Sequence, residues 1–275
     1  MNPDWLQLRR GTSPLIVSIP HTGLDLRGLE PRLVSSWLAR NDADWHIESL
    51  YDFAPALDAT ILRTRVSRTV IDVNRDPSGV SLYPGQATTS LCPTTSFDGE
   101  LLYMLGQEPD ETEIAERRRS YFDPYHETLA EEIARLKGKH GVVTIYDCHS
   151  IRSVIPRLFE GELPEFNLGT NSGASADAGL IDSVREILED SGRSHVVDGR
   201  FKGGYITRSL GRPGENVHAL QMELACRAYL DEPIDLVDAS NWPVAYDPNY
   251  AAPARKILEE ILRGVLDWTL RCARH

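Results

Sequence analysis

Val142-Val143-Thr144-Ile145-Tyr146-Asp147-Cys148-His149-Ser150 is typical of a buried strand that ends in polar residues. A second stretch has the same design, because the apolar run at 15–19 leads into Pro20-His21-Thr22-Gly23. In open α/β sheets, ligands bind at the carboxyl ends of the strands. Two strands that each deliver a histidine to that edge therefore predict an α/β protein with a shared metal ion held by His21 and His149.

A third strand is predicted over residues 219–225. Alternation puts Leu220, Met222 and Leu224 on one face and Gln221 and Glu223 on the other. A glutamate within such an apolar run must be paired, protonated or catalytic. Burial would raise its pKa toward neutrality, as a proton-transferring group requires. Glu223 is the candidate for this role, and the alternative is a glutamate on the solvent face of an edge strand.

A carboxylate is the natural third ligand for a metal held by two histidines. Residues 41–51 are predicted to open a helix and contain Asp42, Asp44, His46 and Glu48. Asp42 and Asp44 also suit the start of a helix, where acids are favoured. Two histidines and one carboxylate leave an open position, the pattern of a catalytic zinc site. The spacing leaves Asp44 and Glu48 as alternatives for the third ligand.

Composition favours an ordinary globular protein and argues against nucleic-acid-binding and membrane-spanning classes. The 275 residues are 41% apolar and 25% charged, as in ordinary globular proteins, and neither an internal repeat nor a linker divides them. We therefore expect one domain over 1–275. A formal charge of −12 argues against nucleic acid as a partner. No apolar run approaches the ~20 residues of a membrane span. Four scattered cysteines and an N-terminus without a signal-peptide pattern predict a cytoplasmic protein.

Cations are concentrated in one region of this acidic chain. Four arginines lie between Arg63 and Arg75 against a single acid, Asp72, which suggests a small anionic ligand or, alternatively, surface ion pairs. Residues 69–73 are predicted to form a strand that presents Arg75 to the crevice, where a guanidinium could grip a carboxylate. A long loop at 76–100 is expected to cover the site. The candidate substrate-binding residues are Arg68, Asn74, Arg75, Lys202 and Arg208.

Taken in order, these motifs resemble the N-formylglutamate deformylase (N-formylglutamate amidohydrolase) family. The resemblance runs from about residue 14 to the C-terminal helix. It rests on Ile19-Pro20-His21-Thr22-Gly23, Asp44-Trp45-His46-Ile47, Ser67-Arg68-Thr69-Val70-Ile71-Asp72-Val73-Asn74-Arg75, Tyr146-Asp147-Cys148-His149-Ser150, Asn167-Leu168-Gly169-Thr170-Asn171, Phe201-Lys202-Gly203-Gly204-Tyr205-Ile206-Thr207-Arg208 and Gln221-Met222-Glu223-Leu224.

The resemblance implies a zinc-dependent amidohydrolase that cleaves N-formyl-L-glutamate to formate and glutamate, the last step of one histidine-degradation route. It implies a three-layer α/β/α fold with a mostly parallel or mixed sheet, like that of zinc-dependent exopeptidases. It also implies His21, Asp44 and His149 as zinc ligands and Glu223 as proton shuttle. One departure concerns Ser209-Leu210, which stands where the family pattern has His-Tyr and bears on substrate preference.

Two other functions are compatible with the same residues. A deacylase of another N-acyl amino acid would use the same metal site and the same glutamate. A non-catalytic binding protein for small dicarboxylates would need the arginines but neither the metal nor Glu223. The lack of an export signal argues against a peptidoglycan amidase. The oligomeric state is not predicted.

Overall fold

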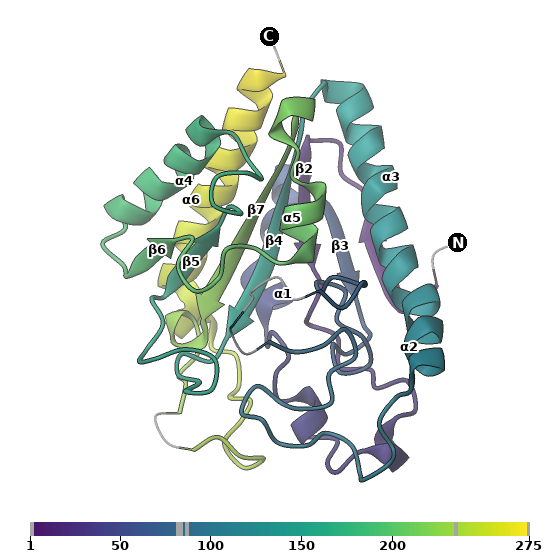
Figure 1. The fold of residues 1–275 in the computed structure, drawn as a ribbon. Coiled ribbons are helices and arrows are strands. Elements are labelled where there is room, and N and C mark those ends of the chain that lie inside the picture. Colours follow the sequence, from purple (N-terminus) through teal and green to yellow (C-terminus); the bar gives the residue numbers. More distant parts are fainter. Residues whose placement is uncertain (1–2, 81–84, 86–87, 234–235, 274–275) are drawn as a thin grey trace.

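The fold is built on one seven-stranded sheet (Figure 1). The computed structural model describes residues 3–80, 85, 88–233 and 236–273. Its strands are β1 (Leu6–Arg9), β2 (Leu15–Ile19), β3 (Thr60–Thr64), β4 (Val143–Ile151), β5 (Phe166–Gly169), β6 (His195–Val197) and β7 (Val217–Ala225).

The α-helices are α1 (Ile47–Leu50), α2 (Glu111–Arg117), α3 (Asp123–His140), α4 (Ala178–Asp190), α5 (Tyr205–Leu210) and α6 (Pro248–Cys272). A π-helical segment, Arg118–Phe122, joins α2 to α3. Short 3-10 helices cover Glu30–Arg32, Leu38–Arg40, Ala54–Leu57, Pro213–Glu215 and Cys226–Ala228. Among the described residues, none of the helices combines the length and apolarity needed to cross a bilayer.

The strand order is β1-β3-β2-β4-β7-β5-β6. The four central strands β3, β2, β4 and β7 are parallel. Strand β1 pairs antiparallel with β3, and β5 pairs antiparallel with β7. The prediction of a mixed, mostly parallel sheet is confirmed. Because β2 and β4 are parallel neighbours, the chain leaves both of them at the same edge of the sheet.

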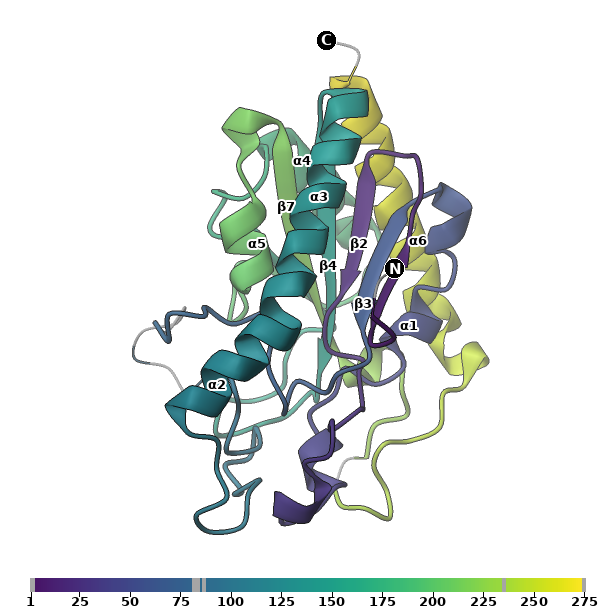
Figure 2. The same cartoon turned by 90° about the vertical axis from the view of Figure 1, so that its right-hand side faces the viewer.

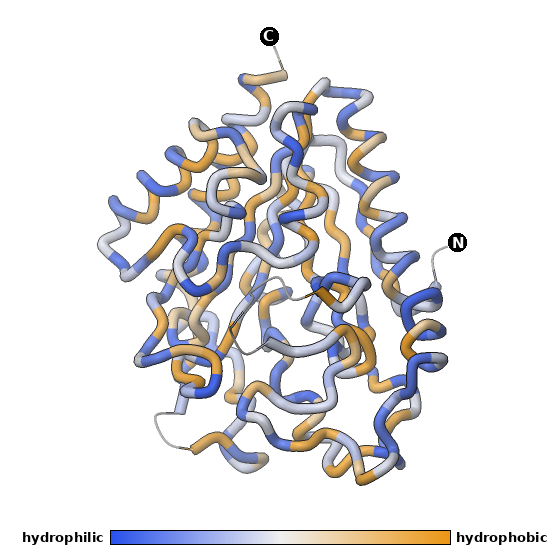
Figure 3. The backbone as a smooth tube through the Cα atoms, viewed as in Figure 1, coloured by the Kyte–Doolittle hydropathy of each residue, from blue (hydrophilic) through white to orange (hydrophobic). Residues whose placement is uncertain are grey.

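Helices pack on both faces of the sheet and complete three layers (Figures 1 and 2). Along β2, Ile16 packs with α3 while Leu15 and Val17 pack with α6. Helix α6 buries Leu258, Ile261, Leu262 and Val265, a spacing that places all four on one side. Hydrophobic and hydrophilic residues accordingly alternate around the outer helices (Figure 3). Full burial of each such side chain contributes roughly 1.5–3 kcal/mol.

Two local predictions were wrong. The helix expected over residues 41–51 is limited to Ile47–Leu50, because His46 adopts a left-handed conformation with φ of 61°. The strand expected at 69–73 is a series of turns. There, the Ser67 hydroxyl accepts from the Thr69 amide, and the Asp72 carboxylate accepts from the Asn74 amide. Such side-chain bonds to nearby backbone compete with strand pairing.

Candidate metal centre

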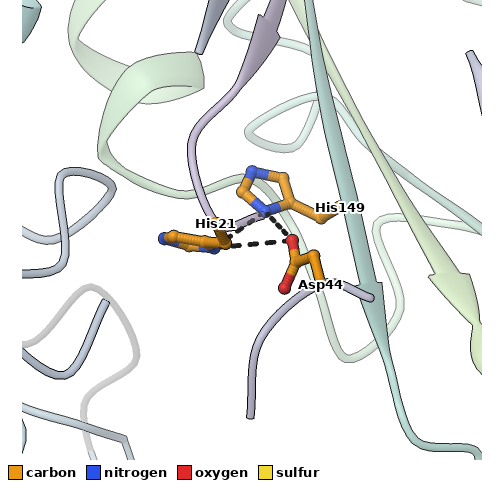
Figure 4. A group of neighbouring side chains, drawn as sticks. All are labelled: His21, Asp44 and His149. Carbon is orange, nitrogen blue, oxygen red and sulfur yellow. Dashed lines mark hydrogen bonds and ion pairs between the residues drawn. The ribbon is translucent and has the colours of Figure 1, made fainter. Parts of the chain in front are cut away.

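Three buried side chains converge at the carboxyl ends of β2 and β4: His21, Asp44 and His149 (Figure 4). His149 Nδ1 lies 3.1 Å from both His21 Nδ1 and Asp44 Oδ2, and His21 Nδ1 lies 3.6 Å from Asp44 Oδ2. Ligand atoms about 2.0–2.1 Å from a tetrahedral zinc are roughly 3.3 Å apart. The three atoms therefore have the spacing and the chemical types that a zinc ion requires.

The main chain brings Asp44 to this cluster. The Asp44 amide donates to the His21 carbonyl over 3.0 Å, which ties the segment before α1 to the end of β2. Asp44 is 1% exposed, whereas the Glu48 side chain is 49% exposed and pairs with Arg63. Of the two acids left open by the sequence, the structure brings Asp44, and not Glu48, to the two histidines.

Each histidine is held by a second carboxylate on its other ring nitrogen. His21 Nε2 lies 2.7 Å from Asp72 Oδ1, and His149 Nε2 lies 2.8 Å from Asp147 Oδ2. An ionised carboxylate can only accept, so each Nε2 carries the proton, and the neutral form of each ring would present the lone pair of Nδ1 to a metal ion. Carboxylate–histidine pairs of this kind orient metal ligands.

Asp72 is kept ionised by its surroundings. Although burial alone would raise it, the pKa of Asp72 lies well below its usual value because of His21, Arg68 and Arg75. Arg68 Nη2 donates to Asp72 Oδ2 over 2.8 Å, and Arg75 Nε lies 3.4 Å from the same oxygen. The arginine-rich segment thus supports His21, which the sequence predicts as a metal ligand.

Asn74 connects the centre to α5. Its Nδ2 donates to Asp147 Oδ2, and its Oδ1 accepts from the Ile206 amide. Gly204, just before α5, packs so closely that an added Cβ would lie 2.4 Å from Asn74 Nδ2. The side-chain amide of Asn74, a predicted substrate-binding residue, is therefore hydrogen-bonded within the protein through both its nitrogen and its oxygen.

Glu223 stands beside the three converging side chains. It is opposite His149 in the parallel β4–β7 register, so both side chains point to the same face of the sheet. Gln221 Nε2 donates to Glu223 Oε2 over 3.1 Å, and Gln221 Oε1 accepts from the Gly204 amide. Burial raises the pKa of Glu223 to about 7. The carboxyl is thus poised to exchange a proton near neutral pH.

A pocket opens over this cluster, and its empty space, open solvent included, amounts to about 560 Å³. The pocket is lined by His21, Arg68, Asn74, Arg75, Thr88, Thr89, Phe97, His149, Ile151, Leu158, Arg200, Phe201, Gly204, Gln221 and Glu223. The long loop expected at 76–100 contributes Thr88, Thr89 and Phe97, while its residues 81–84 and 86–87 lie outside the described part of the chain.

The other predicted substrate-binding residues divide into two groups. Arg68, Asn74 and Arg75 line the pocket. Lys202 is exposed, and Arg208 donates through Nε to the Gly203 carbonyl; neither belongs to the lining among the described residues.

Sequence reasoning missed Asp72 as a histidine partner, Gln221 as the neighbour that holds Glu223, and Arg200 in the pocket wall. Asp72 had a signal in the sequence, since it follows a short apolar run just as Asp147 does.

Comparison with known proteins agrees with this geometry. The family model for N-formylglutamate amidohydrolase matches residues 13–230. The N-formylglutamate deformylase of Pseudomonas aeruginosa is 44% identical over 267 residues, which cover 96% of this chain and 97% of that protein. The chain belongs to the N-formylglutamate amidohydrolase family. A second N-formylglutamate deformylase, from Pseudomonas putida, is 42% identical over 265 residues and 96% of both chains.

Membership of the N-formylglutamate amidohydrolase family agrees with the fold as well. The crystal structure of an N-formylglutamate amidohydrolase from Ralstonia eutropha superposes with a TM-score of 0.73 at 23% identity, covering 98% of this chain and 97% of that one. Ser209, which departs from the family pattern, donates its hydroxyl to the Tyr205 carbonyl within α5. The Ser209 hydroxyl is thus hydrogen-bonded within α5.

Proposed function

We propose that the protein hydrolyses N-formyl-L-glutamate to formate and L-glutamate, within one catalytic domain over residues 1–275. The observation that carries this proposal is a pocket in which the His21–Asp44–His149 cluster, Glu223 and several arginines meet. The 44% identity to an N-formylglutamate deformylase supports the choice of substrate. Both carboxylates of that substrate suit cations on an otherwise acidic protein.

His21, Asp44 and His149 would hold one divalent metal ion, and zinc fits their donor set of two imidazoles and one carboxylate. When bound, zinc lowers the pKa of water and polarises a carbonyl such as that of the formyl group. Asp72 and Asp147 keep the two imidazoles in the orientation and tautomer that this role needs. Of the described residues, these five form the proposed centre.

Glu223 is the proposed general base and acid. As a carboxylate it takes a proton from the attacking water, and it then delivers that proton to the amide nitrogen as the C–N bond breaks. Gln221 holds one carboxyl oxygen of Glu223 by a 3.1 Å hydrogen bond, which limits the rotation of the group. Nitrogen leaves as an amine only if it is protonated, so cleavage requires this transfer.

Arg75 is the proposed partner of a substrate carboxylate. A charge-assisted hydrogen bond contributes roughly 1.5–3 kcal/mol, so Arg75→Met should raise KM about ten- to a hundredfold at ~1.4 kcal/mol per decade. Steady-state kinetics of formate release would measure this. Arg63→Met is a matched control, because Arg63 pairs with Glu48 outside the pocket. A change under twofold for the Arg75 variant would remove Arg75 from the binding site.

The function itself is tested by formate release from N-formyl-L-glutamate before chelation, after chelation and after zinc is added back. We expect activity that is lost with the chelator and restored by zinc. Activity indifferent to chelation would contradict the role of the His21–Asp44–His149 cluster. Zinc-loaded protein that releases no formate would point to another N-acyl amino acid as substrate, and tight substrate binding without any turnover would point to a binding protein.

A further inference from the structure

We propose that Arg200 binds the side-chain carboxylate of the substrate and thereby makes the enzyme select glutamate over glutamine. This inference rests on the proposed function. Arg200 lies in the segment between β6 and α5 and lines the same pocket as His21, His149 and Glu223. Lysine and arginine side chains within a small-molecule pocket are suited to carboxylates, and arginine can bind both oxygens at once.

Two contacts fix the Arg200 guanidinium against the pocket wall. Its Nε donates to the Leu158 carbonyl over 2.8 Å, and its Cζ lies 5.2 Å from the centre of the Phe201 ring. Both Leu158 and Phe201 line the pocket. A guanidinium held by a carbonyl and an aromatic face is oriented before the substrate arrives, which reduces the entropy lost on binding.

The pocket assigns different carboxylates to Arg75 and Arg200. Arg75 is next to the metal centre, since it lies 3.4 Å from Asp72, and the other oxygen of Asp72 contacts His21. The α-carboxylate is attached to the same carbon as the formamide nitrogen and must lie close to the reacting bond. Arg75 is therefore placed for the α-carboxylate.

Arg200 belongs to a different part of the lining. Its contacts among the described residues include Leu158 and Phe201, and Phe159 packs edge-on against the Phe201 ring at 6.3 Å. The side-chain carboxylate of glutamate is separated from the α-carbon by two methylene groups, which suit an apolar wall. A neutral amide in place of that carboxylate would offer the guanidinium one acceptor oxygen and no charge. Glutamine should therefore be discriminated against here.

The test compares N-formyl-L-glutamate with N-formyl-L-glutamine, using zinc-loaded protein and formate release. For Arg200→Met we expect kcat/KM on the glutamate substrate to fall about 100-fold and kcat/KM on the glutamine substrate to change less than about threefold. Arg200→Lys, which keeps the charge but not the fork, should lose less than Arg200→Met. Arg75→Met is the matched comparison and should lower kcat/KM for both substrates by a similar factor, because both carry the α-carboxylate.

An equal loss on both substrates in Arg200→Met leaves the preference for glutamate unchanged and would overturn the proposal. Thermal midpoints of all variants would reveal misfolding. A folding defect would also lower activity on both substrates alike, whereas loss of the Arg200 contact would not. If the zinc-loaded natural protein released formate from neither substrate, the proposed function would fail before any variant was compared.

Discussion

Glu223→Gln should lower kcat by about two to four decades while zinc stays bound, because positioned proton transfer contributes about that much to catalysis. Glutamine has nearly the same shape and cannot take a proton from water. The metal cluster is built from other side chains, so its affinity should change little. Metal analysis and steady-state formate release on the same preparation would measure both quantities.

A matched control for this substitution is Glu165→Gln. Glu165 pairs with Arg193 outside the pocket, and it undergoes the same loss of charge. We expect its kcat to remain within a factor of about two, because Glu165 is not among the residues that line the pocket. Near-normal turnover in Glu223→Gln would refute the proton-transfer role, whereas loss of zinc would mean that Glu223 acts on the metal site instead.

The strands that carry the site could be predicted because their pattern is local. The run at 142–150 and the run at 15–19 are both apolar and end in polar residues, and β4 and β2 form there as parallel neighbours. Alternation along β7 likewise placed Glu223 and Gln221 on one face. A buried strand is specified by its own residues, so periodicity was enough.

The residues that hold the predicted metal ligands in place and complete the pocket wall could not be predicted in the same way. Asp72 reaches His21 across 51 positions of the chain, and the turns around Ser67 that bring it there depend on side-chain bonds to backbone. Periodicity carries no information about which loop returns to which strand. Arg200 is a further example, because its place in the pocket depends on the Leu158 carbonyl of another loop.

Asp44 and Glu48 provide the decisive test of the metal centre, because they are four positions apart and chemically alike. Asp44→Asn should abolish stoichiometric zinc binding, since the amide is a poor ligand that leaves only two imidazoles. Loss of several kcal/mol of charge stabilisation by the metal corresponds to a fall in kcat/KM of at least about a thousandfold. Metal analysis after dialysis and formate release would measure both effects.

Glu48→Gln makes the same neutralisation outside the centre. Its carboxylate is half exposed and faces Arg63, so the change should cost less than about 1 kcal/mol of stability and leave zinc and turnover intact. The opposite outcome, zinc lost in Glu48→Gln and kept in Asp44→Asn, would make Glu48 the third ligand and would require the segment before α1 to rearrange. The 3.0 Å bond from the Asp44 amide to the His21 carbonyl opposes such a rearrangement, because it holds Asp44 at the end of β2.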